Sequence, residues 1–408
     1  MPNPKLVSLS RFVISIPEEQ LIDLRRRLSS TRWPDDVGNK DWFYGVNGAY
    51  LNRLVEYWID GFDWRAAEKM LNGFANYRVT LDDVPIHFLH APGKGPAPLP
   101  LILSHGWPWT HWDWNKVVGP LADPASFSGD PADAFDVIVP SLPGFGFSTP
   151  LPKPDMNFWK IADLFHRLMT ETLGNVRYAA GGSDMGALVT GQLGHKYADS
   201  LHGIYLARGL RLDFFSGERP WDVTGGRMVP DGISSEIRDG IIAYQRRFAA
   251  HVAVHVLDSE TEAYDLTDSP VGMLAWILHR WCNWSDSHGD IESVFPRDHI
   301  LLNATIWWLT NSVRTSMRTY ANAARYPWTP SHDRKPAVEA PVGMTFLGYE
   351  NPPGVTTNKR VEAFSKSPDA AWFNSIFLKA HEKGGHFAPF ENPEAIITDI
   401  RETFRALR

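Results

Sequence analysis

The spacing of hydrophobic positions along the chain changes three times, and these changes divide the sequence into four segments. Residues 1–76 carry apolar side chains at helical spacing, as at Leu21, Leu24 and Leu28. A second amphipathic stretch covers residues 50–58, and a third begins shortly after it. This pattern predicts an N-terminal helical arm over residues 1–76.

From residue 77 onward, short apolar runs replace the helical spacing, and such runs are typical of strands. They cover residues 77–81, 85–90, 99–104, 135–140 and 175–180. Asp82 and Asp83 lie between the first two runs and predict a turn that joins them in a β-hairpin. The last three runs are separated by segments long enough for helices, which indicates parallel strands with crossover connections. We therefore expect residues 77–214 to form the first part of an α/β core.

The third segment, residues 215–330, is helical in pattern and rich in aromatic residues. A strand-like run at 341–348 and a helix at 393–407 then place residues 331–408 back in the core. A sheet interrupted by a helical insertion after its middle is the layout of an α/β-hydrolase with a lid. The predicted fold class is therefore α/β, with a mostly parallel central sheet, a helical lid and an N-terminal helical arm.

Composition narrows the range of functions. The chain has 408 residues, 43% of them hydrophobic and 21% charged, which is ordinary globular material. Its formal charge of −7 provides no basic surface for nucleic acid. The single cysteine, Cys282, excludes an intrachain disulfide, and no apolar run approaches the ~18 residues of a membrane span. We expect a cytoplasmic protein, and a homodimer is one expectation for its oligomeric state.

The segment 181–187 has the pattern of a nucleophile elbow, a tight strand-to-helix turn that exposes one reactive side chain. Such a turn accepts only small residues two before, two after and three after the nucleophile. Asp184 has Gly182, Gly186 and Ala187 at these positions. Ser183 has the bulky Met185 two residues after it, which disfavours a serine nucleophile. The turn therefore predicts an aspartate nucleophile.

An aspartate nucleophile requires a base and an acid further along the chain. Attack by a carboxylate gives an ester, which water activated by a histidine must hydrolyse. In this fold the chain order is nucleophile, acid, histidine. Glu350 follows the strand-like run at 341–348, and His386 follows two glycines that can form a turn. We predict Glu350 as the acid and His386 as the base, with Glu339 and Asp369 as competitors for the acid role.

Two further elements of the chemistry can be proposed from position. The segment 105–108 directly follows a strand, so the Trp107 amide can act as one oxyanion donor and the Met185 amide as another. Opening an epoxide also requires an acid near the ring oxygen, and a tyrosine hydroxyl suits this task. The tyrosines of the insertion are Tyr244, Tyr264, Tyr320 and Tyr326.

Several motifs together resemble the epoxide hydrolases of the microsomal type, the branch of the α/β-hydrolases with an extra N-terminal region. The resemblance covers nearly the whole chain. It rests on residues 23–28, 31–34, 62–65, 105–108, 140–148, 182–186, 268–272, 275–277 and 384–387. It implies an ether-bond hydrolase that converts an epoxide and water to a vicinal diol through an aspartyl ester, with no cofactor and no metal.

The resemblance also implies roles for single residues. Asp184 would be the nucleophile, Glu350 the charge-relay acid and His386 the base. The paired lid tyrosines of the family correspond to Tyr320 and Tyr244. Counting back from residue 268 without gaps places the first of them on His251 instead, so Tyr244 requires an insertion in the lid. Met185 stands where the family usually has tryptophan, which bears on substrate size.

The aromatic lid favours a hydrophobic substrate, such as an aryl or polycyclic epoxide. We expect it to contact His105, Pro108, Trp276, Trp307 and Phe387. The family that the chain resembles includes members with roles in detoxification, hormone degradation and antibiotic pathways. Fold analogy does not choose among them.

Two alternatives use the same framework. A haloalkane or haloacid dehalogenase would use the same aspartate, histidine and acid, but the absence of tryptophan at position 185 weakens this alternative. A non-catalytic hydrolase-fold protein would close its pocket on a ligand without turnover, and the presence of all three catalytic residue types argues against it. Chloride release and diol formation distinguish these alternatives from epoxide hydrolysis.

Overall fold

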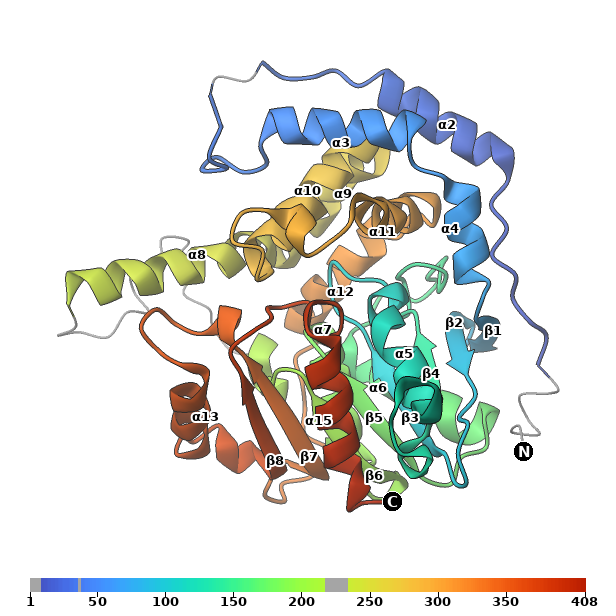
Figure 1. Ribbon diagram of the computed structural model, residues 1–408, viewed down its shortest axis with the longest axis vertical. Helices are drawn as coiled ribbons and strands as arrows, with labels where there is room; N and C mark the ends of the chain where they lie inside the picture. Colours follow the sequence, from blue (N-terminus) through green and yellow to red (C-terminus); the bar gives the residue numbers. More distant parts are fainter. Residues whose placement is uncertain (1–8, 36–37, 217–233) are drawn as a thin grey trace.

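An eight-stranded sheet forms the centre of the computed structural model, which describes residues 9–35, 38–216 and 234–408 (Figure 1). Side chains are described for these residues except 237, 244–246 and 248–249. The strand order is β1-β2-β4-β3-β5-β6-β7-β8. The strands are β1 (Ala75–Leu81), β2 (Val84–Ala91), β3 (Leu99–Ser104), β4 (Phe135–Pro140), β5 (Tyr178–Gly182), β6 (Leu201–Leu206), β7 (Val338–Leu347) and β8 (Phe373–His381).

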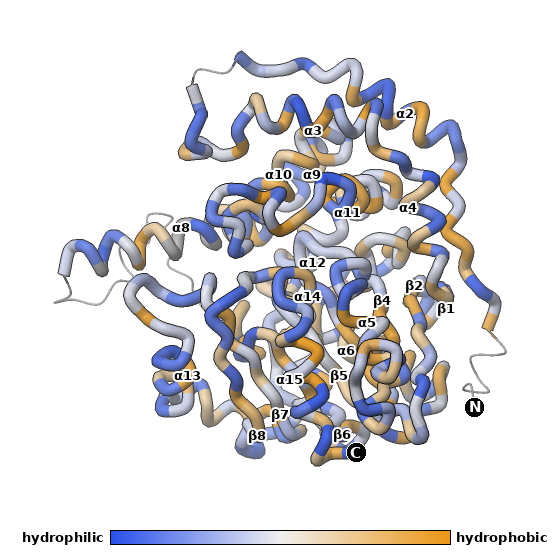
Figure 2. The backbone as a smooth tube through the Cα atoms, viewed as in Figure 1, coloured by the Kyte–Doolittle hydropathy of each residue, from blue (hydrophilic) through white to orange (hydrophobic). Residues whose placement is uncertain are grey.

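The sheet combines an antiparallel edge with a parallel body. β1 pairs with β2, and β2 with β4, in antiparallel register, whereas every pair from β4 through β8 is parallel. Parallel strands are buried on both faces and therefore read as continuous apolar runs. Figure 2 shows hydrophobic residues gathered along these strands and on the helices that flank them. The predicted α/β-hydrolase fold class is confirmed.

Helices cover both faces of the sheet. On one face α5 packs against α15, and on the other α6 packs against α7 (Figure 1). Helix α13 packs against the edge strand β8. The bounds of these helices are α5 (Asn115–Ala122), α6 (Phe158–Arg167), α7 (Met185–Lys196), α13 (Thr357–Ser365), α14 (Ala388–Glu391) and α15 (Pro393–Arg405).

A helical lid lies above the carboxyl ends of the strands, inserted in the chain between β6 and β7 (Figure 1). Its helices are α8 (Ser235–Leu257), α9 (Ser259–Asp268), α10 (Pro270–Trp284), α11 (Arg297–Leu309) and α12 (Val313–Arg325). Helix α12 packs against both α8 and α9. None of the helices in the described parts of the chain is long and apolar enough to cross a membrane.

The N-terminal arm crosses the outside of the lid and descends to the sheet. Its helices are α2 (Glu18–Ser29), α3 (Gly48–Asp60) and α4 (Trp64–Leu71) (Figure 1). Arg27 Nη1 donates to the Asp268 carbonyl and carboxylate, both at 2.9 Å. Trp58 Nε1 donates to Thr305 Oγ1 at 2.9 Å. The buried Trp58 contact joins arm and lid through the interior, whereas the exposed Arg27 pair adds little stability.

The sequence located most of the elements that the structure contains. The strands expected at 99–104 and 135–140 are present with these same ends, and those expected at 77–81, 85–90 and 341–348 are present with slightly different ends. Strand β5 begins later than expected, at Tyr178, and continues to Gly182. The sequence did not reveal β6 and β8. Most side chains of β8 are exposed or half-buried because it is the edge strand, so its residues lack the apolar run of a central strand.

The turn between β5 and α7 brings the backbone of two elements into direct contact. Asp184 has φ 54° and ψ −125°, an unfavourable conformation for a residue with a side chain. A Cβ at position 186 would lie 2.2 Å from the Ser104 carbonyl oxygen, and one at position 182 would lie 2.3 Å from the Gly186 carbonyl oxygen. Glycine at position 186 is therefore required for α7 to approach the end of β3 this closely, and glycine at position 182 for the end of β5 to approach the first turn of α7.

We predict that Gly186→Ala lowers the free energy of unfolding by ~1–3 kcal/mol, because the added methyl group meets backbone that cannot move aside. Urea denaturation monitored by circular dichroism would measure this loss. The matched control is Gly191→Ala in the same helix, where the nearest atom to the new Cβ is a Leu212 methyl group at 3.2 Å. Equal stability of the two variants would contradict the close-approach explanation.

Candidate active site

Four segments that follow strands of the sheet meet beneath the lid. The segment after β3 carries Trp107, the turn after β5 carries Asp184, the turn after β7 carries Glu350, and the loop after β8 carries His386. The carboxyl ends of parallel strands lie at the same edge of a sheet, so residues far apart in the sequence converge there. All four of these residues are buried.

Asp184 is held between two partners. Its Oδ1 accepts a hydrogen bond of 2.8 Å from the Trp107 amide. Its Oδ2 lies 3.0 Å from His386 Nε2. The two contacts fix the plane of the carboxylate. The residue Asp184 as a whole is 7% exposed. Met185, the first residue of α7, is buried beside it, and the role of its amide as a second oxyanion donor stays a prediction.

Glu350 lies on the far side of the histidine ring. His386 Nδ1 is 3.1 Å from Glu350 Oε1, and Arg208 Nη1 donates to the same oxygen at 3.1 Å. Arg360 Nη2 lies 3.5 Å from Glu350 Oε2. Burial alone would raise the pKa of the Glu350 carboxyl, but the Arg208 charge and the hydrogen bond from His386 hold that pKa well below its usual range. Glu350 is therefore an anion at all relevant pH values.

The protonation of His386 follows from its two carboxylate neighbours. Burial lowers the pKa of its imidazole, but the charges and hydrogen bonds of Asp184 and Glu350 outweigh burial and raise the pKa to about 9. At neutral pH the resting site thus contains an imidazolium between two carboxylates. A histidine in this state orients the nucleophile but cannot accept a proton until one of the negative charges is removed.

The loop that carries His386 is tied to the end of the lid helix α10. The His386 amide donates to the Trp284 carbonyl at 2.9 Å, and the Gly384 amide donates to Asp286 Oδ2 at 2.9 Å. Glu391 accepts from the Asp286 amide at 2.7 Å and from the Phe387 amide at 2.8 Å. Burial raises the pKa of the Glu391 carboxyl to about 7. The position of the catalytic loop therefore depends on the position of the lid.

Sequence reasoning missed Arg208, Arg360 and Glu391. Arg208 directly follows β6, a strand that the apolar pattern did not reveal. The two arginines and the glutamate resemble the many other charged residues of the chain, and only their contacts distinguish them. Their importance follows from their neighbours in space, for which the sequence contains no local signal.

Tyr320 on α12 faces the nucleophile from the lid. It is 0% exposed, and its ring packs edge-to-face on Trp107 at 6.3 Å between centroids. Burial and then the negative charge of Asp184 raise the pKa of the Tyr320 hydroxyl well above its usual value, so it remains protonated. Tyr264 and Tyr326 are 74% and 42% exposed, respectively, which places both outside the buried site. The Tyr244 position is on α8, but its side chain lies outside the described residues.

Two histidines of α8 complete the lid side of the site. His251 is 3% exposed and its ring stacks on Trp107, with 5.3 Å between centroids and 2° between planes. His255 is 0% exposed and contacts Tyr320 edge-to-face at 4.8 Å. The wall above Asp184 is thus formed by aromatic rings and two imidazoles.

The five residues that the sequence predicted to contact substrate differ in their contacts within the protein. The ring nitrogens of His105 are both engaged, Nε2 by the Leu142 amide at 3.1 Å and Nδ1 by the Gly106 carbonyl at 2.9 Å. We therefore infer that His105 holds the loop rather than contacting substrate. Pro108 is buried and follows a cis peptide bond, and Trp276 Nε1 donates to His255 at 3.2 Å. The ring of Trp307 packs on Phe145, and that of Phe387 stacks on Trp109. Substrate contact by these four residues stays a prediction.

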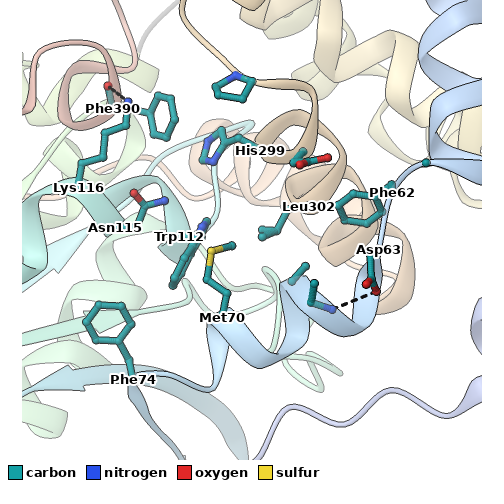
Figure 3. A pocket seen from close by; sticks show the side chains of 15 residues that line it. Phe62, Asp63, Met70, Phe74, Trp112, Asn115, Lys116, His299, Leu302 and Phe390 are labelled. Atoms are coloured by element: carbon teal, nitrogen blue, oxygen red, sulfur yellow. Dashed lines mark hydrogen bonds between the residues drawn. The ribbon is translucent and has the colours of Figure 1, made fainter.

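A separate groove of about 600 Å³ lies on the outer surface between the arm, α5 and α11 (Figure 3). It is lined by apolar side chains including Phe62, Met70 and Trp112. Asp184, Glu350 and His386 are not among its lining residues. The buried cluster beneath the lid, and not this groove, therefore combines the groups that catalysis requires.

Comparisons with known proteins converge on one family. Residues 9–114 match the model described as "Epoxide hydrolase N terminus", and residues 100–254 match the alpha/beta hydrolase fold. A protein of Stigmatella aurantiaca, provisionally named an epoxide hydrolase, is 35% identical over 98% of this chain and 86% of its own length. Epoxide hydrolase 1 of Oryctolagus cuniculus is 28% identical over 96% of this chain and 88% of its own. The Aspergillus niger epoxide hydrolase structure shares the fold, with a TM-score of 0.78, 24% identity and coverage of 98% and 97%.

We predict that the His386 imidazole titrates near pH 9, because Asp184 and Glu350 both favour its protonated form. Asp184→Asn removes the stronger of the two charges, so the titration midpoint should fall. NMR of histidine labelled with ¹⁵N would measure both midpoints, with His386→Gln to assign the signal.

The matched control is Glu402→Gln, an exposed change on α15 that should leave the His386 midpoint where it is. In the wild type, protonated His386 contributes stability through its contacts with Asp184 and Glu350. This contribution is complete below pH ~6.5 and disappears as the pH rises through about 9. A wild-type midpoint near the ordinary value of ~6.5 would show that the carboxylates do not control this histidine.

Proposed function

Because this chain belongs to the epoxide hydrolase family and is an epoxide hydrolase, we propose that it opens its substrate through a covalent ester on Asp184. One observation carries the assignment of Asp184. Its carboxylate lies on a strained turn in the buried site and is held between the Trp107 amide and His386, which in turn contacts Glu350. A carboxylate that is oriented in this way and has a paired histidine beside it is suited to nucleophilic attack followed by hydrolysis.

The first step forms the ester. An Asp184 carboxylate oxygen donates an electron pair to one epoxide carbon, and the carbon–oxygen bond of the ring breaks. The electron pair of that bond goes to the ring oxygen, which takes the proton of the Tyr320 hydroxyl and becomes the first alcohol. Tyr320 becomes a phenolate, and the burial of the site favours prompt return of a proton to it.

The second step hydrolyses the ester. Ester formation removes the negative charge of Asp184, so the largest factor that keeps His386 protonated disappears and its pKa falls. His386 gives up its proton, which returns the Tyr320 phenolate to a phenol by way of water. The neutral His386 then takes a proton from a water molecule, whose oxygen attacks the ester carbonyl. The Trp107 amide donates to the resulting oxyanion. Collapse expels the diol oxygen, which receives the proton from His386. The new Asp184 carboxyl group then gives its proton to His386, which restores the resting pair of carboxylate and imidazolium.

The buried lid supports a hydrophobic substrate. Trp107, Trp284 and Tyr320 surround the nucleophile and are all less than 2% exposed, so an aryl or polycyclic epoxide would meet mostly apolar surface. Met185 takes less space beside Asp184 than a tryptophan would. The proposal includes a homodimer and a role in detoxification or in secondary metabolism.

We predict that His386→Gln accumulates the ester, because ring opening requires Asp184 but hydrolysis requires the imidazole. Intact-protein mass spectrometry after mixing with styrene oxide should show an adduct of one substrate mass, and turnover should fall on the order of 10²–10⁴-fold. In ¹⁸O-water, a single turnover of the wild type should label the Asp184 carboxylate, while the first diol carries no label.

Asp184→Ala should form neither adduct nor diol, and Glu402→Gln, an exposed change on α15, should behave as the wild type. Full activity of Asp184→Ala would overturn the covalent mechanism. Thermal melting of each variant checks that the fold is retained.

We also predict a preference for large apolar epoxides. The ratio kcat/KM for aryl epoxides should exceed that for small aliphatic epoxides by roughly 10-fold or more, because each buried methylene contributes about 1–3 kcal/mol to discrimination. Met185→Trp should reduce the activity on polycyclic epoxides more than that on styrene oxide. Chiral chromatography of the diols would measure rate and enantiomer together. Equal kcat/KM across the series would contradict an apolar pocket. Release of chloride from haloalkanes would show that the enzyme also acts as a dehalogenase.

A further inference from the structure

The lid presents two buried imidazoles to a site that otherwise has aromatic walls. His251 and His255 are one turn apart on α8, so they lie on the same face of the helix. Their exposures are 3% and 0%. Burial of a polar ring is costly unless the ring has a hydrogen-bonding task, and the two-step reaction described above assigns no task to either histidine.

His251 adjoins the residues that hold the catalytic groups. Its ring stacks on Trp107, the residue whose amide donates to Asp184. It also lies 4.6 Å from the ring of Trp284, which packs on His386 at 4.9 Å. Its third neighbour is Tyr320, at 5.9 Å between centroids. His251 therefore lies among the neighbours of the nucleophile, the base and the proton donor.

The Tyr320 hydroxyl is one donor for an oxygen that can accept two hydrogen bonds. Among the described residues this hydroxyl has no hydrogen-bond partner, although it is fully buried and under the influence of the Asp184 charge. A ring oxygen gains negative charge as its bond to carbon breaks, and two donors stabilise that charge better than one. An imidazole N–H can donate to this oxygen whether the ring is neutral or protonated.

His255 is fixed in a different role. Trp276 Nε1–H donates to His255 Nε2 at 3.2 Å, so the proton of the neutral ring is on Nδ1. Burial, and then the Arg280 charge, lower the pKa of His255 well below its usual value. His255 is thus a neutral ring whose tautomer is set by the tryptophan of α10. It packs beside His251 at 5.5 Å and limits the space in which the His251 ring can move.

The position of Tyr244 on α8 is remote from this cluster along the helix. It precedes His251 by seven residues (251 − 244), which corresponds to about 10 Å along the helix axis. Since His251 contacts Trp107 and Tyr320, the backbone two turns earlier is displaced from them by that length. Helix geometry therefore favours His251 over Tyr244 as the second group at the ring oxygen.

We propose that His251 is a catalytic residue that donates an N–H hydrogen bond to the epoxide oxygen during ring opening, alongside Tyr320. The proposal rests on the proposed ester mechanism at Asp184. Tyr320 remains the source of the transferred proton, and His251 stabilises the charge that develops on the oxygen before the transfer. His251 has no part in the hydrolysis of the ester, which belongs to His386.

Rapid-quench kinetics with styrene oxide would test this assignment, because ester formation and ester hydrolysis are then measured separately. His251→Phe keeps an aromatic ring and removes the N–H, so ester formation should slow on the order of 10²-fold while the hydrolysis of the ester keeps its rate. His251→Tyr supplies a hydroxyl donor from the same helix position and should recover most of the rate of ester formation. Tyr264→Phe, an exposed change on α9, is the matched control.

Tyr244→Phe and His255→Gln test the competing residues. A loss of ester formation in Tyr244→Phe or His255→Gln, with the wild-type rate in His251→Phe, would overturn the proposal. A loss in His251→Phe that His251→Tyr does not recover, or that extends equally to hydrolysis, would indicate a packing role and overturn it too. If the wild type itself forms no ester on Asp184, the proposed function fails independently of His251.

Discussion

Direct contact between the backbone at the start of α7 and the end of β3 is the constraint on which the site depends. The contact exists only because position 186 has no side chain to separate the helix from the Ser104 carbonyl. It brings Asp184 onto a turn of unfavourable backbone conformation and to within 2.8 Å of the Trp107 amide. The strain of the turn is compensated by the packing of β5 and α7 in the centre of the fold. Asp184 and the Trp107 amide, the proposed nucleophile and oxyanion donor, are thus positioned by the same few backbone atoms.

The charges that converge on this turn act as one unit. Asp184, His386 and Glu350 alternate in sign, and the half-buried Arg208 and Arg360 complete the row next to Glu350. Each charge compensates the cost of burying the next, so the row is stable only as a whole. In the proposed mechanism, conversion of Asp184 to a neutral ester breaks the alternation and favours release of the proton from His386. The proposed first step would thereby prepare His386 to act as the base in the second.

The lid contributes as much to the site as the sheet does. Tyr320 and His251 approach from α12 and α8, and the end of α10 holds the loop of His386 through Glu391. The N-terminal arm lies across the outside of the lid and is joined to it by the buried bond from Trp58 to Thr305 (Figure 1). Displacement of the lid would therefore disturb Tyr320, the loop of His386 and the pocket wall together. This coupling explains why an arm far from the nucleophile is part of the same folded unit.

The sequence by itself determined the features that depend on neighbouring residues. Small residues around Asp184 identified the elbow, and apolar runs located the central strands, because both signals arise from local sterics and burial. Only the tertiary structure decided the features that depend on contacts across the chain: the edge strand β8, Arg208 behind Glu350, Glu391 beneath the catalytic loop, and His251 on Trp107. Charged residues and histidines are common throughout the chain, so their residue type gives no information about their partners. Their partners were decided by tertiary packing, which for Arg208 and His251 joins positions more than a hundred residues apart.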